Sequence, residues 1–571
     1  PDRDPRPRRR VKPGRGPSPD LAEAMALHKA GQLAEAIERY RAIRRAFPKD
    51  LAALNLLGAA LIQSGDAAEA LPLLEEACAL APGFAEAESN RAAALNALVR
   101  FAEAEEAARL ALKAKPDYPE ALNNLGNALQ ARHLHRDAVE AYEKSLALRH
   151  GAAETLNACG VSLKALGRLD EALAAVDKAI ALFPDFPAAH SNRAAVLKEL
   201  GRYEEALAAC DRALALEPGM VEAWGNRAVT FAALERIEEA EAAYLEAKTL
   251  QPGHPEILWN LSMVRLAQGR LAEGWPDYEH RWCRPTSRIL PHEEIPLWRG
   301  EPGLPLKGKT LLVQFEQGFG DAIQMLRYVP VLEAMGAACI LEMPEALFTL
   351  ALRNFPRARV IPMDAPPTGA DYRIPLMSLP LALRTETVAA IPGQVPYLRP
   401  DPAAVERWRG VIRPDPRPKF GLVWRGNASH IDDRNRSARL DDFLPLLENR
   451  NALWFVLQKG LTDEENERLK AFGTAVAFDR ALPTFDDTAA LLEFVDVVIT
   501  VDSAPAHLAG ALGKRTAVLL PFHADWRWLR NRADSPWYPT ARLYRQRTPG
   551  DWAGTIGGIA AEIAGQNRPR S

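Results

Sequence analysis

The chain has 571 residues, 48% of them hydrophobic, so it is long and apolar enough to form more than one packed domain. Its net charge of -3 excludes a strong global attraction to nucleic acid or to an anionic membrane, and its five cysteines lie too far apart for a disulfide framework or a zinc site. No apolar run approaches the roughly 18 residues that span a bilayer, so we expect a cytoplasmic protein that does not insert into a membrane. We also expect neither bound nucleic acid nor bound metal.

Residues 1–18 form a basic segment, with seven lysines and arginines among prolines and glycines. This composition predicts a disordered tail, because the segment cannot bury enough apolar surface to offset the entropy of folding. The tail either contacts an acidic partner or is solvated.

From about residue 19 the sequence repeats with a period of 34 residues. A proline ends each unit, with His150 in one slot, and small residues recur where two antiparallel helices would touch. The prolines are Pro48, Pro82, Pro116, Pro184, Pro218 and Pro252, and one unbroken alanine column contains Ala36, Ala70, Ala104, Ala138, Ala172, Ala206 and Ala240. The pattern resembles the tetratricopeptide repeat (TPR) family, which implies an α-solenoid, a TPR superhelix with a concave binding face, over residues 19–288.

An asparagine column accompanies the repeats, on the first helix of each unit. It contains Asn90, Asn124, Asn192, Asn226 and Asn260. An amide donates and accepts hydrogen bonds, so a ladder of asparagines suits the backbone of an extended acceptor peptide of any sequence. The column resembles the asparagine ladder in the TPR arm of eukaryotic O-linked N-acetylglucosamine transferases. The alternative is that these side chains are solvated or make hydrogen bonds between repeats.

Tryptophans crowd the end of the repeats, where Trp259, Trp275, Trp282 and Trp298 follow one another closely. Their aromatic surface can join the last repeats to the next domain, so we expect a fixed arm rather than a flexible tether. We place the domain boundary near residue 288.

Beyond that boundary the pattern alternates between strands and helices, which predicts two α/β domains with parallel sheets, residues 289–415 and 416–571. A helix is expected over Ala322 to Met335 and a closing helix over Trp552 to Ala564. The expected strands are Lys309 to Glu316, Ala338 to Met343, Ala358 to Met363, Lys419 to Trp424, Leu453 to Gln458, Val476 to Phe478, Val495 to Val501 and Thr516 to Leu520.

A glycine-bearing turn follows the first of these strands. Gly318 and Gly320 allow the backbone to approach a ligand closely, and Asp321 lies where the next helix begins. Asp321 either caps that helix or faces a cleft and accepts a proton from an attacking hydroxyl.

A long polar loop, residues 424–440, follows a buried strand in the second half and includes Arg425, Asn427 and His430. Lys459 lies at the end of the next strand. Cations in these positions suit a diphosphate or a sugar carboxylate.

The stretch 495–521 reads as strand, turn, helix and strand, with Gly513 in the position that ends a helix. Asp502, Ser503 and Ala504 lie at the amino end of this helix, where unpaired N–H groups and the helix dipole favour a phosphate. His507, in the first turn, could add an imidazole N–H. The alternative is that Asp502 and Ser503 only cap the helix and that His507 is a surface histidine.

Five segments carry a more specific resemblance: EQGFGDAIQ, GLVWRGN, DRNRS, LQKG and VITVDSAPAHLAGALGK. Together with DWRWL and SPWYP they resemble bacterial TPR-linked glycosyltransferases whose catalytic part is related to the heptosyltransferases (glycosyltransferase family 9), over residues 296–553. The resemblance implies a metal-independent, inverting α/β GT-B fold of two Rossmann-like domains, with an acceptor-side N-terminal half and a donor-side C-terminal half.

By this resemblance Asp321 corresponds to the proposed catalytic base. Asp502, Ser503, Ala504 and His507 match the segment that binds the donor phosphate, and Arg425, Asn427 and Lys459 are assigned to the donor side. The polar loop differs from the lysine-bearing loop of the heptosyltransferases, which leaves the nucleotide and the sugar open.

The TPR arm joined to such a domain resembles flagellin glycosyltransferases of alphaproteobacteria. It implies a protein O-glycosyltransferase that transfers a sugar, such as pseudaminic acid or another nonulosonic acid, from a nucleotide sugar to Ser/Thr of a protein such as flagellin, without a cofactor. Two alternatives stay open: a glycan- or lipid-linked acceptor, with repeats that only recruit the enzyme, or a TPR scaffold without turnover.

Overall fold

The computed structural model describes residues 19–149, 151–284, 290–363, 365–427 and 433–566. The expected tail 1–18, the repeat position His150 and the boundary near residue 288 lie outside these ranges. The chain divides into two compact units, Pro1–Thr230 and Phe231–Ser571, and each is treated separately below.

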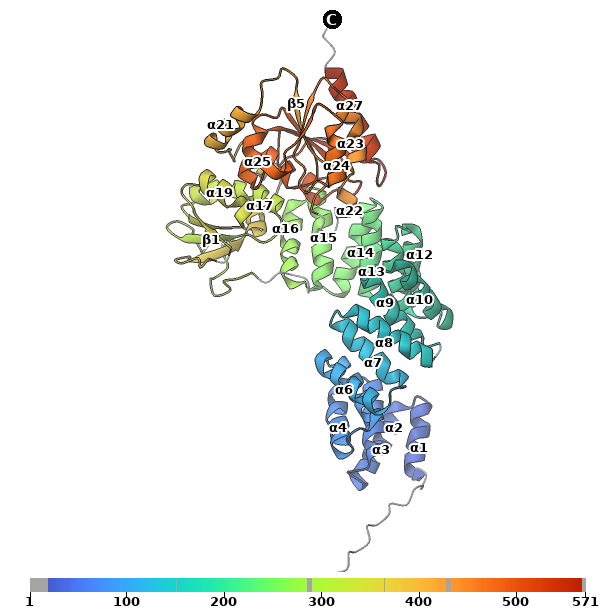
Figure 1. Ribbon diagram of the computed structural model, residues 1–571. Helices are drawn as coiled ribbons and strands as arrows, with labels where there is room; N and C mark the ends of the chain where they lie inside the picture. The colour runs from blue at the N-terminus through green and yellow to red at the C-terminus, as the bar shows by residue number, and fades with distance from the viewer. Residues whose placement is uncertain (1–18, 150, 285–289, 364, 428–432, 567–571) are drawn as a thin grey trace, which may run out of the picture. The chain divides into compact units, whose positions relative to one another are not determined.

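The first unit is a stack of antiparallel helix pairs, coloured blue to green in Figure 1. Its helices are α1 (Pro19–Lys29), α2 (Leu33–Ala46), α3 (Leu51–Gln63), α4 (Ala67–Leu80), α5 (Ala85–Ala97), α6 (Phe101–Ala114), α7 (Pro119–Ala131), α8 (His135–Leu148), α9 (Ala153–Ala165), α10 (Leu169–Leu182), α11 (Pro187–Glu199), α12 (Tyr203–Leu216) and α13 (Val221–Ala233). The boundary between the two units falls within α13. The helical solenoid expected from the repeats is therefore confirmed.

Small residues bring the two helices of a pair into contact, as the repeat pattern predicts. A Cβ added to Gly126 on α7 would lie 2.4 Å from the ring of Tyr142 on α8, and one on Gly58 would lie 2.7 Å from Leu74. Both distances are shorter than a van der Waals contact, so any larger side chain would push the helices apart.

The second unit begins with helices of the same kind. They are α14 (Ile237–Leu250), α15 (Pro255–Ala267), α16 (Leu271–Tyr278) and the 3-10 turn η1 (Glu279–Cys283). The predicted aromatic contact between repeats and the next domain is confirmed here, because the ring of Trp275 lies 5.2 Å from that of Trp526 and its Nε1–H donates to the Thr385 carbonyl at 2.9 Å.

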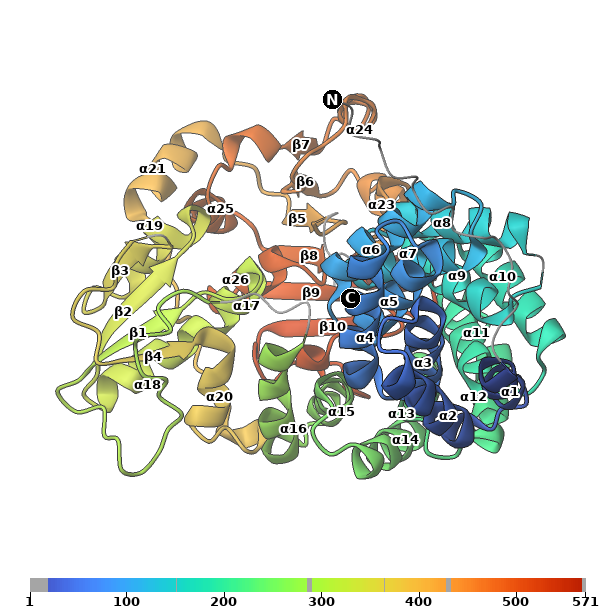
Figure 2. The same ribbon diagram turned by 90° about the horizontal axis from the view of Figure 1, so that it is seen from below.

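Within the described residues, the first α/β half contains a four-stranded parallel sheet in the order β3-β2-β1-β4 (Figure 2). Its strands are β1 (Thr310–Gln314), β2 (Ala338–Met343), β3 (Arg359–Pro362) and β4 (Tyr372–Pro375). The helices and 3-10 turns of this half are α17 (Phe319–Met325), η2 (Leu326–Tyr328), α18 (Val329–Ala334), α19 (Glu345–Asn354), η3 (Leu376–Ser378), α20 (Leu379–Ala382) and η4 (Val388–Ala390).

The second α/β half contains a six-stranded parallel sheet, again counted over the described ranges, in the order β10-β9-β8-β5-β6-β7. The strands are β5 (Lys419–Val423), β6 (Leu453–Val456), β7 (Ala475–Ala477), β8 (Val497–Val501), β9 (Arg515–Leu520) and β10 (Ala541–Arg545). The helices and 3-10 turns after residue 415 are α22 (Asp433–Arg436), α23 (Leu440–Leu447), α24 (Asp463–Lys470), η5 (Asp479–Ala481), α25 (Phe485–Leu492), α26 (Ala504–Ala511), η6 (Trp526–Trp528) and α27 (Trp552–Gln566). Helix α21 (Pro402–Val411) precedes residue 416 but packs against α25 of this half.

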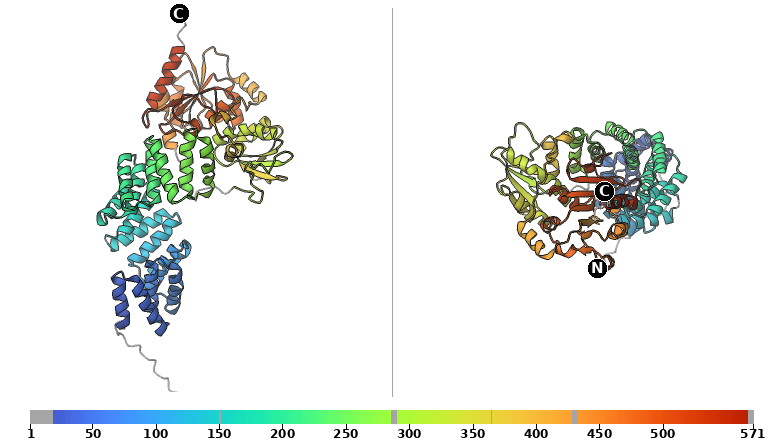
Figure 3. Two further views of the ribbon diagram at one scale, coloured as in Figure 1. Left: turned by 180° about the vertical axis from the view of Figure 1, so that it is seen from behind. Right: turned by 90° about the horizontal axis from the view of Figure 1, so that it is seen from above.

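Apolar side chains cover both faces of this sheet. Helices α23 and α27 pack on one face through residues such as Phe443 and Ile556, and α25 and α26 pack on the other through residues such as Leu491 and Leu508. The red helix α27 is visible from behind in Figure 3. Two parallel sheets are thus confirmed, as expected for an α/β region.

The single helix expected over Ala322 to Met335 is wrong in detail. The structure has α17, the turn η2 and α18 instead, with Pro330 in the first turn of α18. Proline lacks the N–H that would continue the helix from the preceding turn, so the chain restarts its helix there.

In the part of the chain that the structure describes, no helix is both long and apolar enough to cross a bilayer.

Candidate functional site

The amino ends of two helices, one from each α/β half, meet at one place in the second unit. Helix α17 begins after β1 and α26 begins after β8, and the two helices pack side by side (Figure 2). A Cβ on Gly320 would lie 2.7 Å from Cδ2 of His507 and 3.5 Å from Cα of Ala504. Glycine is therefore required for this approach, in agreement with the close backbone contact expected at Gly320.

Asp321 caps α17 and also forms an ion pair. Its Oδ2 accepts a hydrogen bond from the Gly318 N–H at 2.7 Å, which completes a capping arrangement. Its Oδ1 accepts a hydrogen bond from the Arg527 guanidinium. The side chain keeps 20% of its exposure, so it is reachable from solvent. The capping alternative is confirmed, and the partly exposed carboxylate leaves the second alternative open.

Arg527 is the residue that the sequence reasoning missed. It lies on η6, is buried, and donates to Oε1 of Gln324 at 2.9 Å and to Oδ1 of Asp525 at 2.7 Å. Burial disfavours its charge, but Asp321 and Asp525 outweigh that effect and raise its pKa. Only its place in the DWRWL segment marked it in the sequence.

Asp502 is buried at the carboxyl end of β8 and is 8% exposed. Burial, helped by the negative charge of Asp525, raises the pKa of the Asp502 carboxyl to about 7. The indole of Trp528 and the cations Arg527 and Arg436 act in the opposite direction. A carboxyl with such a pKa is largely protonated in mildly acidic solution.

His507 is buried rather than at the surface, so the surface alternative is wrong. Its Nδ1 is 2.9 Å from the Tyr538 hydroxyl, its ring stacks on Trp528 with centroids 5.3 Å apart, and its Nε2 is 4.0 Å from Oδ1 of Asp502. Burial, with Arg527 and other nearby cations, lowers the pKa of His507 well below 6.5, while burial raises that of Tyr538. A neutral imidazole that accepts from Tyr538 carries its proton on Nε2, on the side of Asp502.

Ser503 is the N-cap residue of α26, but its side chain does not cap the helix. The hydroxyl donates to the Val501 carbonyl at 3.1 Å and lies 3.1 Å from Oγ1 of Thr500. The alternative that Ser503 caps the helix is therefore wrong, because the hydroxyl donates to the carbonyl of the preceding strand instead. Ala504 starts the helix, and Gly513 ends it with a φ of +70°, as expected.

The cations assigned to the donor side already have partners within the second half. Arg425 pairs with Glu465 and donates to the Gly460 carbonyl at 2.6 Å. Lys459 donates to the carbonyls of Asp479 and Leu482, and burial lowers its pKa. Asn427 is exposed, and His430 lies outside the described residues.

Four asparagines of the ladder donate to the preceding repeat, in the manner of one alternative given for them. The amide of Asn90 donates to Oδ1 of Asn55 at 2.8 Å, and that of Asn192 to Oδ1 of Asn157 at 2.9 Å. Asn124 and Asn226 donate to Ser89 and Ser191 in the same way. These five ladder positions, Asn260 included, are each half-buried.

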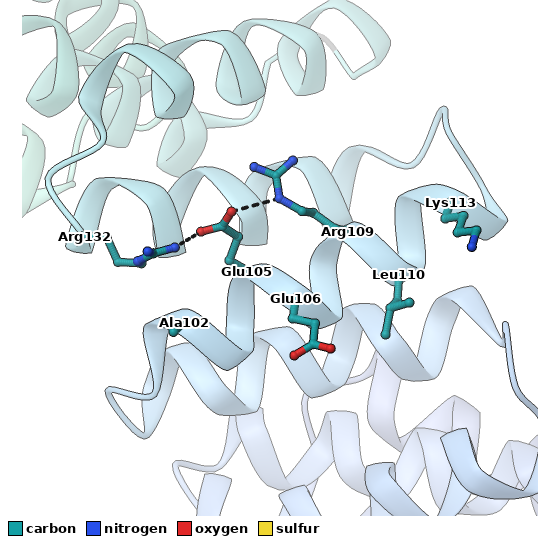
Figure 4. A pocket seen from close by; sticks show the side chains of 7 residues that line it. All are labelled: Ala102, Glu105, Glu106, Arg109, Leu110, Lys113 and Arg132. Atoms are coloured by element: carbon teal, nitrogen blue, oxygen red, sulfur yellow. Dashed lines mark hydrogen bonds and ion pairs between the residues drawn. The ribbon is translucent and has the colours of Figure 1, made fainter.

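A surface depression of ≈ 370 Å³ lies on α6, in the first unit (Figure 4). Glu105 lies between Arg109 and Arg132 in this depression and pairs with both. The partners therefore neutralise its charge, and the depression lacks the convergent groups found around Asp321. Among the described residues, no three His, Cys, Asp or Glu side chains are grouped so as to hold a metal ion.

Family models described as "Tetratricopeptide repeat" match residues 21–85, 62–119, 117–185, 157–220 and 192–255. Protein FlbA of Caulobacter vibrioides (strain ATCC 19089 / CIP 103742 / CB 15) is 29% identical over 328 residues, which cover 53% of this chain and 54% of that protein. The chain thus spans about half the length of the curated relative that it matches.

Two solved structures are also similar. The APC/C hetero-tetramer Cut9-Hcn1 matches with 16% identity over 47% of this chain and 53% of that one, with a TM-score of 0.41. A thermophilic TPR protein in Thermus thermophilus matches with 25% identity over 32% and 99%, with a TM-score of 0.30. The family models show that residues 21–255 form tetratricopeptide repeats.

Proposed function

We propose that this chain is an inverting protein O-glycosyltransferase with a GT-B catalytic region. In this proposal residues 289–415 bind the acceptor side and residues 416–571 bind the nucleotide-sugar donor. The observation that carries it is the contact between Gly320 and His507, which brings the amino ends of α17 and α26 together at the carboxyl ends of two parallel sheets. Open α/β sheets bind their ligands at this end of the strands.

The donor phosphate would lie at the amino end of α26. Backbone N–H groups and the helix dipole attract an anion there, and the neutral His507 offers an Nε2–H donor. The raised pKa of Asp502 reduces the repulsion between its carboxyl and a phosphate. Ser503 supports this role, because its hydroxyl is turned toward the strand and does not occupy the helix end.

Asp321 would accept the proton of the attacking hydroxyl. The Arg527 guanidinium and the Gly318 N–H hold the carboxylate in place, and each carboxylate oxygen has a second lone pair beyond the hydrogen bond that it already accepts. The acceptor oxygen forms a bond to the anomeric carbon, the bond from that carbon to the phosphate oxygen breaks, and the electron pair leaves with the nucleotide. The proton passes to Asp321.

The repeats supply the surface for the protein acceptor, since tetratricopeptide repeats are protein-interaction modules. We propose Ser/Thr of a polypeptide such as flagellin as the acceptor, and pseudaminic acid or another nonulosonic acid as the sugar. The ladder asparagines would bind the acceptor backbone through the part of each amide that the neighbouring repeat does not use.

One observation favours a second candidate function. The N–H groups of Asn90, Asn124, Asn192 and Asn226 already serve inter-repeat hydrogen bonds, which favours repeats that recruit the enzyme while the acceptor is a glycan or a lipid-linked sugar. A TPR scaffold without turnover is the corresponding non-enzymatic case.

The proposal is tested by incubating the full chain with flagellin and, in turn, CMP-, UDP- and GDP-linked sugars, and by measuring the intact mass of the flagellin. Transfer gives a mass increase of one sugar residue per modified Ser/Thr. No increase with any donor, together with transfer to a glycan or lipid-linked acceptor, would favour the second candidate, and the absence of any transfer would favour the scaffold.

A further inference from the structure

The last repeat contacts the loop that carries Asp321. We infer that Tyr278 and Arg281, which close the repeats, are positioning residues for residues 316–321, so that the end of the solenoid is part of the active site. The inference rests on the proposed function, because it assigns the loop a catalytic task. Three separate contacts carry it.

The first contact comes from a tyrosine column of the repeats. Tyr40, Tyr142, Tyr244 and Tyr278 occupy the same position in the 34-residue period, and all four are buried. In the first unit the Tyr142 hydroxyl lies 2.8 Å from each of two acceptors within the solenoid, Oδ1 of Asn127 and Oε1 of Gln130, to which it can donate.

Tyr278 uses the same column position differently. Its hydroxyl accepts from Nε2 of Gln317 at 3.1 Å and lies 3.4 Å from Oε1 of the same amide. Gln317 directly precedes Gly318, whose N–H is held by Asp321. The hydroxyl therefore holds the Gln317 side chain, one residue before Gly318, where α17 begins and where Asp321 takes its orientation.

The second contact is a buried ion pair one residue earlier in the loop. Nε and a terminal nitrogen of Arg281 donate to the two carboxylate oxygens of Glu316, at 3.0 and 3.2 Å. The side chains are only 5% and 3% exposed. The Met377 N–H also donates to Glu316, and Ser378 joins the Arg281 side of the network. A two-point pair without solvent access holds a loop in one position, because any displacement would leave the buried Glu316 carboxylate without its cation, while Arg281 keeps its second partner, Glu279.

The third contact reaches the other partner of Asp321. The ring of Trp275, one turn before Tyr278, packs edge-on against Trp526, whose neighbour is Arg527. Tyr278 also contacts Trp526, with ring centroids 6.2 Å apart. The same repeat thus supports both the Asp321 loop and the segment that supplies its guanidinium partner.

The repeat column offers a matched pair of variants in the full chain. Tyr278→Phe removes one hydroxyl and keeps the ring that packs against Trp275 and Trp526. Tyr142→Phe removes a hydroxyl from the same column position, whose acceptors both lie within the first unit. Hydrogen exchange of the peptide that covers residues 315–325 is measured first, because it needs no turnover.

For Tyr278→Phe we expect exchange of the Gly318 to Asp321 amides to be about 3- to 10-fold faster, as expected for loss of one hydrogen bond. The kcat for sugar transfer should fall by a similar factor, with donor KM and nucleotide Kd within about twofold. Tyr142→Phe should leave exchange and kcat unchanged. Gln317→Met should reproduce the Tyr278→Phe effect, and the double variant should add little, because both changes remove the same interaction.

Unchanged exchange and kcat in Tyr278→Phe, in a chain that does transfer sugar, would overturn the inference and leave the proposed function intact. Equal effects of Tyr278→Phe and Tyr142→Phe would also overturn it, since they would indicate a general loosening of the solenoid. Faster loop exchange in Tyr278→Phe alone, in a chain that transfers no sugar to any acceptor, would support the structural coupling and overturn the proposed function.

Discussion

The guanidinium of Arg527 donates a hydrogen bond to Oδ1 of Asp321, although the two residues are 206 positions apart in the chain. The bond joins the loop after β1 in the first half to the turn η6 in the second. It fixes the position of the carboxylate beside the amino end of α26. The proposed chemistry depends on this arrangement, because the acceptor and donor loops then meet at one carboxylate.

Asp321→Asn should reduce sugar transfer by about 10²- to 10⁴-fold, because an amide cannot accept the proton of the hydroxyl. Nucleotide binding should change by less than about threefold, which calorimetry would detect. Asp442→Asn is the matched control, since Asp442 holds the Arg439 N–H at 2.9 Å in the same capping arrangement at the start of α23. Transfer by Asp321→Asn at more than a tenth of the wild-type rate would rule out Asp321 as the base.

Gly320→Ala should destabilise the second unit and weaken nucleotide binding. The added Cβ would lie 2.7 Å from His507, whose ring is held by Tyr538 and Trp528 and cannot move aside freely. Overpacking of this kind costs about 1–3 kcal/mol. Gly473→Ala, at an exposed turn where a Cβ meets nothing within 4 Å, is the control and should change neither denaturant midpoint nor affinity. Equal behaviour of the two variants would contradict the close approach.

Affinity for a nucleotide should fall as the pH rises through about 7, because Asp502 then loses its proton and repels the phosphate. The charged groups that face Asp502 are Asp525, Arg527 and Arg436, and the lowered pKa of His507 keeps that ring neutral over this range. Isothermal calorimetry between pH 6 and pH 8 measures the trend. Asp502→Asn should remove it, and an identical slope in that variant would contradict the assignment.

The raised pKa of Asp502 also predicts how the stability of the fold changes with pH. The pKa of Asp502 rises from 3.8 to about 7 on folding, so between these values unfolding releases a proton. The free energy of unfolding should therefore fall as the pH rises through this window, and the favourable contribution is complete only below the lower value. Denaturant titrations of the wild type and Asp502→Asn, compared across pH 4 to pH 7, isolate this contribution from those of other groups.

Asn226→Ala should weaken binding of the acceptor polypeptide by about fivefold or more. Its amide also donates to Ser191, so the variant should lose about 1 kcal/mol of stability as well. Ser145→Ala is the control, because the buried Ser145 hydroxyl donates to the Pro119 carbonyl at 2.8 Å and its loss should cost a similar amount. Equal acceptor affinity in the two variants, measured by calorimetry with flagellin, would leave the ladder a purely structural role.

Periodicity predicts most of the fold. The 34-residue columns predict the helix pairs because the residues of one column pack in the same way in every repeat. The buried strands β2, β5 and β8 are predicted because they are continuous apolar runs. The edge strands β4 and β10 were missed. In β10 the charged Arg542 and Arg545 interrupt the apolar residues, and β4 ends in proline, so neither strand forms an apolar run.

The candidate site is only half predictable. Asp321, Asp502 and His507 follow from strand ends and helix starts, which are local patterns. Arg527, Tyr538 and the Tyr278–Gln317 contact depend on pairs of residues that only the folded chain brings together, and no spacing rule connects them. The alternative that Ser503 caps α26 fails because an N-cap position does not determine which acceptor its hydroxyl takes.

The most direct measurement is a thermal-shift panel of the full chain with UDP, GDP, ADP, CMP and their sugar conjugates, run on the wild type, on His507→Gln and on His190→Ala. A ligand that binds only the folded state raises its stability by mass action. The account predicts that one nucleotide stabilises the wild type and His190→Ala, whose half-buried ring belongs to the repeats, while His507→Gln loses most of the shift. No shift with any nucleotide, or an equal shift in all three proteins, would contradict a donor site at α26.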